Sequence, residues 1–218
     1  MAEPVFVYLH GFASGPGSNK ARFFAEKFAA AGVPLELPDL NEGEGAFRGL
    51  TLSRSLAQVR AILDAKGAER AVLIGSSLGG YVAALAAAKD PRVEALVLLC
   101  PAFDLPARWT SKLGDEGMAL WRKARELPVD HHAFGRKEPI GFGLYIDALG
   151  HSPYPPVDAP TLILHGVNDE DVPVGTSRKF AEGMPNVRLV EYDSDHGLLD
   201  VTEPIWEETR AFLAPWLP

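Results

Sequence analysis

Residues 70–80 read Arg-Ala-Val-Leu-Ile-Gly-Ser-Ser-Leu-Gly-Gly, and this stretch decides the fold. An apolar run typical of a β-strand ends in the pattern G-x-S-x-G over residues 75–79, and a helix-like stretch follows at once. A turn this sharp between strand and helix holds its central residue in a strained backbone conformation with an exposed side chain. Small residues are needed two positions before and after it, because the two backbones crowd there. The pattern makes Ser77 a candidate nucleophile.

The composition is typical of a globular protein. The chain has 218 residues, of which 47% are hydrophobic and 23% are charged. This length predicts one domain over residues 1–218 with a substantial core. The net charge of −8 disfavours nucleic-acid binding, because such binding needs a concentrated basic surface. A single cysteine, Cys100, excludes an intrachain disulfide framework.

The sequence gives no sign of targeting to a membrane. Its first residues have neither the basic region nor the long apolar region of a signal peptide. No apolar run reaches about 18 residues, the length that a membrane-spanning helix needs. We therefore expect a cytoplasmic protein without a membrane span.

Apolar runs rich in β-forming residues alternate with helical patterns along the chain. Several of these runs are continuously apolar, as in strands that are covered on both faces. Strands that alternate with helices predict an α/β fold, with a mainly parallel sheet of about six strands and helices on both faces. The predicted strands are 5–9, 35–38, 71–74, 93–99, 161–164 and 187–192, and the predicted helices are 20–31, 52–65, 78–89, 176–183 and 204–213.

Residues 103–157, between the fourth and fifth predicted strands, interrupt this alternation. The segment contains no convincing strand but is rich in aromatic residues, glycine and proline. A long insertion at the catalytic end of a sheet is often a lid or a binding element. A pair of helices packed on the edge of the sheet is an equally good interpretation. We therefore expect either a lid-like insertion or such a helix pair.

Ser77 would need a base, because a serine hydroxyl is a poor nucleophile at neutral pH. Imidazole suits this role, since its pKa lies near the working pH. One of the six histidines, His196, follows the last predicted strand. The other candidates are His10, His131, His132, His151 and His165.

The motifs together resemble the α/β-hydrolase superfamily, and in particular its small bacterial esterases. The resemblance rests on the opening 8–12, on its continuation rich in serine and glycine, and on 75–81. It covers nearly the whole chain except the insertion. One departure is that the sheet of the superfamily commonly begins with two further strands. The resemblance therefore implies a shortened α/β-hydrolase fold.

The resemblance also implies a catalytic triad. In this superfamily the triad residues follow in the order Ser, Asp or Glu, His, with the histidine after the last strand. Only His196 fits this order as the base. We expect Asp169, in the loop after the fifth predicted strand, to orient the imidazole. Asp171 in the same loop and Asp104 after the fourth predicted strand are the alternatives.

Two backbone N–H groups usually stabilise the oxyanion of the tetrahedral intermediate. One should come from Leu78, which follows the nucleophile, and the other from Phe12 in the loop after the first strand. In this interpretation, the ring of His10 holds that loop in place and is not a base. No cofactor and no metal ion is expected.

These residues predict a serine hydrolase, a carboxylesterase-like enzyme that cleaves a small acyl ester through an acyl-enzyme. A thioesterase or another acyl hydrolase or transferase would use the same triad. The acyl group, the leaving group and the oligomeric state stay open. Four aromatic side chains of the insertion are candidates for an apolar pocket wall or for the core: Trp109, Trp121, Phe142 and Tyr145.

Two other classes of protein compete with this prediction. Residues 11–17 have a G-x-x-x-G-x-G spacing after an apolar strand, as in reductases that bind dinucleotides. Such reductases also need a Tyr-x-x-x-Lys pair, and none of the five tyrosines has lysine four positions later. A binding protein of the same fold without catalytic activity is the second alternative, because fold does not fix function.

Overall fold

The computed structural model describes residues 2–43 and 45–218, and its centre is a parallel sheet of six strands. The strand order is β2-β1-β3-β4-β7-β8, and every neighbouring pair is parallel. This order confirms the predicted fold class. The strands are β1 (Val5–Leu9), β2 (Leu35–Glu36), β3 (Ala71–Ser76), β4 (Val93–Leu99), β7 (Thr161–Gly166) and β8 (Val187–Tyr192).

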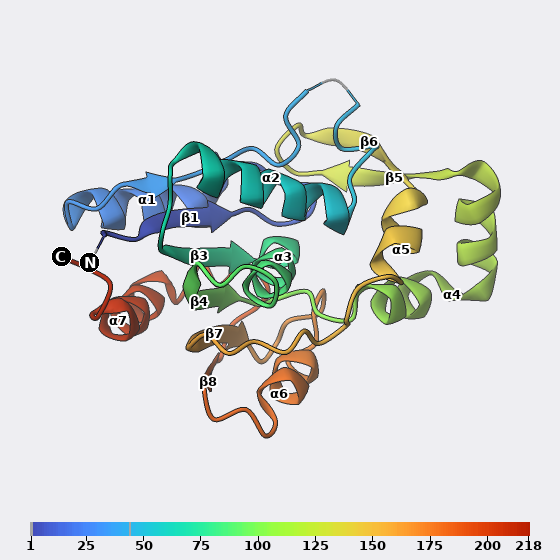
Figure 1. Cartoon of the computed structure of the whole chain (residues 1–218). Helices are drawn as coiled ribbons and strands as arrows, with labels where there is room; N and C mark the ends of the chain where they lie inside the picture. Colours follow the sequence, from blue (N-terminus) through green and yellow to red (C-terminus); the bar gives the residue numbers. More distant parts are fainter. Residues whose placement is uncertain (1, 44) are drawn as a thin grey trace.

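Helices cover both faces of the sheet (Figure 1). On one face, α1 (Asn19–Ala30) packs against α7 (Thr202–Leu213), and both contribute to one apolar core. On the other face, α2 (Leu52–Ala65), α3 (Leu78–Ala87) and α6 (Gly175–Ala181) contribute to a second core. Every residue of β3 is buried, which explains why the strand is apolar without alternation.

All six strands end at the same edge of the sheet. The register pairs Leu9 with Gly75, and it pairs Gly166 with Tyr192. The loops after β1, β3, β7 and β8 therefore leave the sheet side by side. This is the edge where ligands bind in open α/β sheets.

The insertion between β4 and β7 contains strands as well as helices. Its elements are α4 (Leu105–Ala124), β5 (Glu126–His131), β6 (Arg136–Gly141) and α5 (Gly143–Ala148). The prediction that residues 103–157 hold no strand was wrong, because β5 and β6 form an antiparallel hairpin. The hairpin carries a proline in each strand, Pro128 opposite Pro139, and proline disfavours a strand prediction.

The insertion lies beyond the carboxyl ends of the strands (Figure 1). Two backbone hydrogen bonds tie the hairpin to the rest of the chain. His132 N–H donates to Ala13 O at 2.9 Å, and Gly141 N–H donates to Arg48 O at 3.0 Å. The hairpin is thus joined to the loop after β1, and a lid function for the insertion stays a prediction. In the part of the chain that the structure describes, no helix combines the length and the apolar character that crossing a bilayer requires.

Candidate active site

Ser77 occupies the turn between β3 and α3 with φ 54° and ψ −116°. This is a strained conformation for a residue with a side chain, and it persists only where neighbouring groups hold it. Ser77 N–H donates to Leu99 O at 2.8 Å, and Ser77 O accepts from Ala102 N–H at 2.9 Å. The backbone of the neighbouring strand β4 and its following loop therefore fixes the turn from both sides.

Glycine is required on both sides of Ser77. A Cβ atom on Gly75 would overlap the carbonyl oxygen of Gly79. A Cβ atom on Gly79 would overlap the carbonyl oxygen of Leu9 and would lie 2.6 Å from that of His10. The G-x-S-x-G pattern is thus explained by the close approach of α3 to β3 and to the end of β1.

His196 and Asp169 are in contact. His196 Nδ1 lies 2.6 Å from Asp169 Oδ2, although one residue follows β8 and the other follows β7. Asp169 is only 6% exposed, and its Oδ1 accepts from the amides of Val172 at 2.7 Å and Asp171 at 3.0 Å. The carboxylate is therefore held on one oxygen by its own loop and presents the other to the imidazole.

The other two candidate acids lie elsewhere. The Asp171 side chain is 63% exposed and lies 3.8 Å from Lys112 Nζ. Asp104 stands at the N-terminal end of α4 in a left-handed backbone conformation, with φ 51°. Of the three carboxylates, Asp169 is the one that has a hydrogen bond to His196 among the described contacts.

The loops that carry Asp169 and His196 are bonded to each other. Asn168 N–H donates to Ser194 O at 3.0 Å, and Gly166 lies so close that a Cβ atom there would overlap the same oxygen. Lys20 Nζ, from α1, donates a hydrogen bond to His196 O at 2.8 Å. These contacts hold the loop of His196 at two points, Ser194 and His196 itself.

The surroundings of Asp169 favour its ionised form. Burial alone would raise the pKa of this carboxyl, but hydrogen bonds from His165 and His196 outweigh it and hold the pKa well below its usual range. Asp169 is therefore negatively charged at neutral pH. A charged carboxylate at this place can orient a neutral imidazole and stabilise it once it is protonated.

Ser77 lies at the same sheet edge as the Asp169–His196 pair. Within the described residues, no hydrogen bond joins the Ser77 hydroxyl to His196. Hydrogen bonds between catalytic groups are often long without substrate and shorten when it binds. The structure thus brings the predicted acid and base together, while the contact of His196 with Ser77 stays a prediction.

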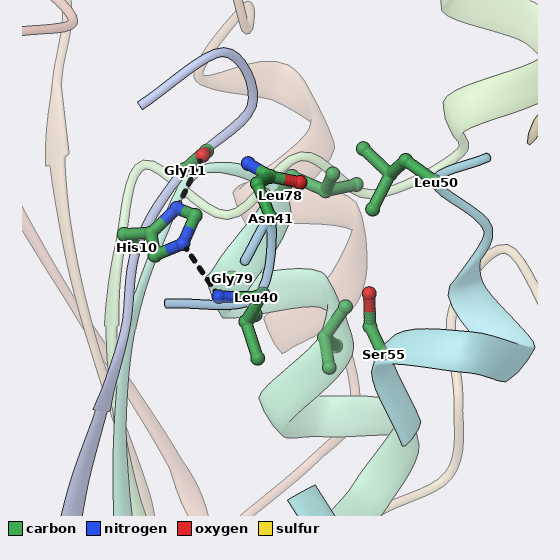
Figure 2. A pocket seen from close by; sticks show the side chains of 9 residues that line it. His10, Gly11, Leu40, Asn41, Leu50, Ser55, Leu78 and Gly79 are labelled. Atoms are coloured by element: carbon green, nitrogen blue, oxygen red, sulfur yellow. Dashed lines mark hydrogen bonds between the residues drawn. The ribbon is translucent and has the colours of Figure 1, made fainter. Parts of the chain in front are cut away.

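The two predicted oxyanion donors belong to adjacent loops. A Cβ atom on Gly11 would lie 3.3 Å from Ser77 Cβ, so the loop after β1 packs directly on the turn that holds Ser77. Gly11 and Leu78 line the same small cavity (Figure 2). Neither the Phe12 nor the Leu78 N–H donates to another described residue. Both amides are therefore available to an oxyanion, and their role stays a prediction.

His10 has both ring nitrogens engaged (Figure 2). Its Nδ1 lies 2.9 Å from Gly11 O, and its Nε2 accepts from Leu40 N–H at 3.0 Å. The ring thus joins the loop after β1 to the chain that follows β2. The cavity beside it measures only about 10 Å³, which leaves room for one water molecule at most.

The four predicted wall aromatics form one continuous cluster with Phe12. Trp109 meets the Phe12 ring at a centroid distance of 5.8 Å and the Trp121 ring at 4.8 Å. Trp121 then contacts Phe142 at 5.3 Å, which contacts Tyr145 at 5.4 Å. Trp121 is 1% exposed, so its ring belongs to the core. Of the four, Trp109 is the one in ring contact with Phe12.

Sequence reasoning missed Phe47 among these aromatics. Its ring centroid lies 5.2 Å from that of Phe12 and 4.6 Å from that of His131. Phe47 stands in an irregular segment before α2 and follows no strand or helix pattern. Only its aromatic character could have marked it.

A larger cavity of about 480 Å³ opens beside the loop after β1. This volume is within the range of about 300–1,000 Å³ that small ligands occupy. The tip of the hairpin and the chain that follows β2 complete its wall. Its lining residues are Ser14, Gly15, Pro16, Gly17, Ser18, Asn19, Asp39, Asn41, His132, Ala133 and Phe134.

One group of three possible metal ligands lies together among the described residues. The ligand atoms of Cys100, His165 and Asp169 are within 4.8 Å of one another, and all three residues are buried. Burial raises the pKa of the Cys100 thiol to about 12, whereas a metal ligand must be the thiolate. Both nitrogens of His165 are already hydrogen-bonded. Cys100 and His165 are therefore better explained as hydrogen-bonding neighbours of Asp169 than as metal ligands.

The parallel sheet, the strained serine turn and the Asp–His pair at its edge define an α/β-hydrolase-fold protein. The chain belongs to the uncharacterised protein family UPF0227, whose family description matches residues 5–213.

Several relatives of the chain are named as hydrolases. The chain is 26% identical over 217 residues to the palmitoyl-protein thioesterase ABHD10 of Bos taurus, covering 88% of this chain and 64% of that protein. It is 28% identical to the pimeloyl-[acyl-carrier protein] methyl ester esterase of Nitrosomonas europaea, covering 86% of each. The chain thus spans 61–71% of the length of the mammalian relatives that it matches.

Solved structures share the fold. Mouse α/β-hydrolase domain-containing protein 10 superposes with a TM-score of 0.83 and 24% identity, covering 100% of this chain and 92% of that one. Est1E from Butyrivibrio proteoclasticus, bound to ferulic acid, superposes with a TM-score of 0.80 and 24% identity, covering 97% and 90%. At this identity the likeness concerns the fold.

Proposed function

We propose that the protein is a serine hydrolase that cleaves small acyl esters through an acyl-enzyme, with Ser77, His196 and Asp169 as its triad. One observation carries the proposal. The buried Asp169 carboxylate holds His196 at 2.6 Å, at the edge of the sheet where a strained turn exposes Ser77. The relatives named as esterases and thioesterases support the same class of reaction.

In the first step, Ser77 Oγ attacks the ester carbonyl while His196 Nε2 takes its proton. Asp169 accepts from His196 Nδ1, and this fixes the tautomer in which Nε2 is the base. The carbonyl oxygen becomes an oxyanion, which the N–H groups of Phe12 and Leu78 stabilise. His196 then protonates the leaving alcohol, and the acyl group stays on Ser77.

In the second step, water attacks the acyl-enzyme with His196 again as the base. The same two amides stabilise the second oxyanion. Its collapse breaks the bond between the acyl carbon and Ser77 Oγ, His196 returns the proton to Ser77 Oγ, and the acid product leaves. Every proton transfer in this scheme uses His196, so no cofactor is needed. The aromatic cluster around Phe12 and Trp109 can contact the acyl or the alcohol part of the ester.

A thioesterase is the second candidate, because five mammalian relatives are named palmitoyl-protein thioesterase. Paired oxygen and sulfur esters of one acyl group, offered over a series of chain lengths, separate the two activities. A higher kcat/KM for the oxygen ester at every length supports the esterase. A higher kcat/KM for the thioester, greatest for long chains, favours the thioesterase.

The proposal requires that Ser77→Ala lose hydrolysis of short p-nitrophenyl esters by at least about 10³-fold while the protein stays folded. Ser53→Ala, at an exposed serine of α2, is the matched control and should keep its activity. Equal hydrolysis by Ser77→Ala and the native protein would reject Ser77 as the nucleophile, whereas no hydrolysis by the folded native protein would leave a binding protein of this fold.

A further inference from the structure

His165 is a buried histidine that the triad does not use. It lies in β7, four residues before Asp169, and it is 0% exposed. Its Nδ1 lies 2.7 Å from Ser177 Oγ of α6, and its Nε2 lies 2.8 Å from the carbonyl oxygen of Val172. Both nitrogens are therefore engaged, on opposite sides of the ring.

These partners determine where the proton of His165 lies. A backbone carbonyl can only accept, so Nε2 must carry a hydrogen. Nδ1 of a neutral ring then accepts from the Ser177 hydroxyl, which can rotate to donate. The contact with the Val172 carbonyl therefore places a proton on Nε2 of His165.

The Nε2–H of His165 also faces the triad carboxylate. Nε2 lies 3.3 Å from Asp169 Oδ2, the same oxygen that accepts from His196 Nδ1. In addition, Nε2 is hydrogen-bonded to the peptide oxygen of Val172, whose own N–H donates to Asp169 Oδ1. His165 therefore acts on both carboxylate oxygens, directly on one and through the Val172 turn on the other.

We propose that His165 is a positioning residue for Asp169. It holds the carboxylate in the orientation that His196 needs and keeps it ionised in a buried place. This inference rests on the proposed function, because it assigns His165 a part in the same triad. His165 does not touch the reacting atoms.

Other groups near Asp169 do not replace this contact. The ammonium group of Lys20 and the guanidinium group of Arg108 act on Asp169 through space. The hydrogen bonds recorded for them go to His196 O and to Asp171 O. The Cys100 thiol is neutral, since burial raises its pKa to about 12. A neutral thiol is a weak hydrogen-bond donor, so without His165 the strong nitrogen donor that remains at Oδ2 among the described contacts is His196.

The experiment compares two substitutions of His165. His165→Gln retains an amide N–H near the position of Nε2 and an oxygen that can accept from Ser177. His165→Leu has a similar volume but removes both groups. We expect His165→Leu to lower kcat about tenfold to a hundredfold, because an interaction with a charged group is lost. KM should change little, and His165→Gln should recover most of kcat.

The pH profile separates positioning from a general loss of stability. With His165→Leu, the Asp169 carboxylate loses a hydrogen-bond donor and attracts the proton on His196 Nδ1 more strongly. The acid limb of the kcat profile, where the base becomes protonated, should therefore shift to higher pH. Leu63→Ala is the control, because Leu63 is a buried residue of α2 that lies far from the triad. It should lower the melting temperature without moving the acid limb.

A second variant decides the question if His165→Leu does not fold. Ser177→Ala removes only the hydroxyl that is hydrogen-bonded to His165 Nδ1, and a shift of its acid limb to higher pH supports the proposal. If the variant that is measured folds and keeps both the acid limb and the kcat of the native protein, the positioning role is overturned. Loss of activity in Ser77→Ala, measured alongside, shows whether the triad itself stands.

Discussion

His196 Nδ1 lies 2.6 Å from Asp169 Oδ2, although 27 residues separate the two in the chain. The contact exists because β7 and β8 are neighbouring parallel strands that end together, with Gly166 opposite Tyr192. The loop after β7 turns back on itself, so that two of its amides hold Asp169. The sheet thus places an acid and a base next to each other without any covalent constraint.

Asp169→Asn should lower kcat by about 10³- to 10⁴-fold. The amide would offer an N–H or a weaker acceptor to His196 Nδ1, and the imidazole would lose its preferred tautomer. Asp171→Asn is the matched control, because that side chain is exposed, and its kcat should stay within about threefold. Kinetics with one p-nitrophenyl ester measure both variants. The reverse order of the two effects would move the triad acid to Asp171.

The stability of the folded protein should depend on the charge of Asp169. Its pKa is lower in the folded chain than the value of about 3.9 in an unfolded chain. The ionised carboxylate therefore contributes stability above about pH 4, and this contribution is lost as the pH falls toward the lower folded pKa. Asp169→Asn lacks this titration.

Urea unfolding of native protein and Asp169→Asn at several pH values between 3 and 7, in steps of about one, measures this contribution. The native protein and Asp169→Asn should differ less in their free energy of unfolding near pH 3 than near pH 7. Other carboxylates titrate equally in both proteins and cancel in the difference. A difference that stays constant over this range would show that Asp169 has an ordinary pKa.

Lys20→Met should lower kcat by about two- to tenfold, because the hydrogen bond from Nζ to His196 O is lost and the loop of the base is less well fixed. Lys27→Met, on the same helix α1, is the control. Lys27 pairs with Glu203 on α7 and has no contact with the loop of His196 among the described residues. An equal kcat for both variants would show that Lys20 does not help to position His196.

Gly79→Ala should destabilise the fold by at least about 3 kcal/mol, because a Cβ atom there meets the backbone oxygens of Leu9 and His10. Gly175→Ala is the matched control, since nothing lies within 4 Å of its Cβ position, and its effect should stay within about 1 kcal/mol. Thermal or urea unfolding measures both. A small effect at Gly79 would show that α3 can move away from β1.

The sequence was most informative where local pattern and backbone geometry coincide. The buried run of β3, its two glycines and the buried helix α3 predict the turn at Ser77 without knowledge of other contacts. Asp169 and His196 could be predicted because each follows a recognisable apolar strand. In a parallel sheet, such positions meet at one edge.

Features that depend on contacts between distant segments could not be predicted in this way. The hairpin of β5 and β6 alternates only weakly between buried and exposed residues, and each strand contains a proline. His165 is another example, since its sequence context shows only a histidine at the end of a strand. Its importance depends on the positions of Ser177 and Val172 in the folded chain.

The central claim is that Ser77 is an activated nucleophile, and covalent labelling tests it most directly. Native protein treated with a fluorophosphonate should gain the mass of one phosphonyl group, and peptide mapping should place it on Ser77. Labelling should be slow in Asp169→Asn and absent in Ser77→Ala. Rapid labelling of folded Ser77→Ala, or none of the folded native protein, would contradict the account.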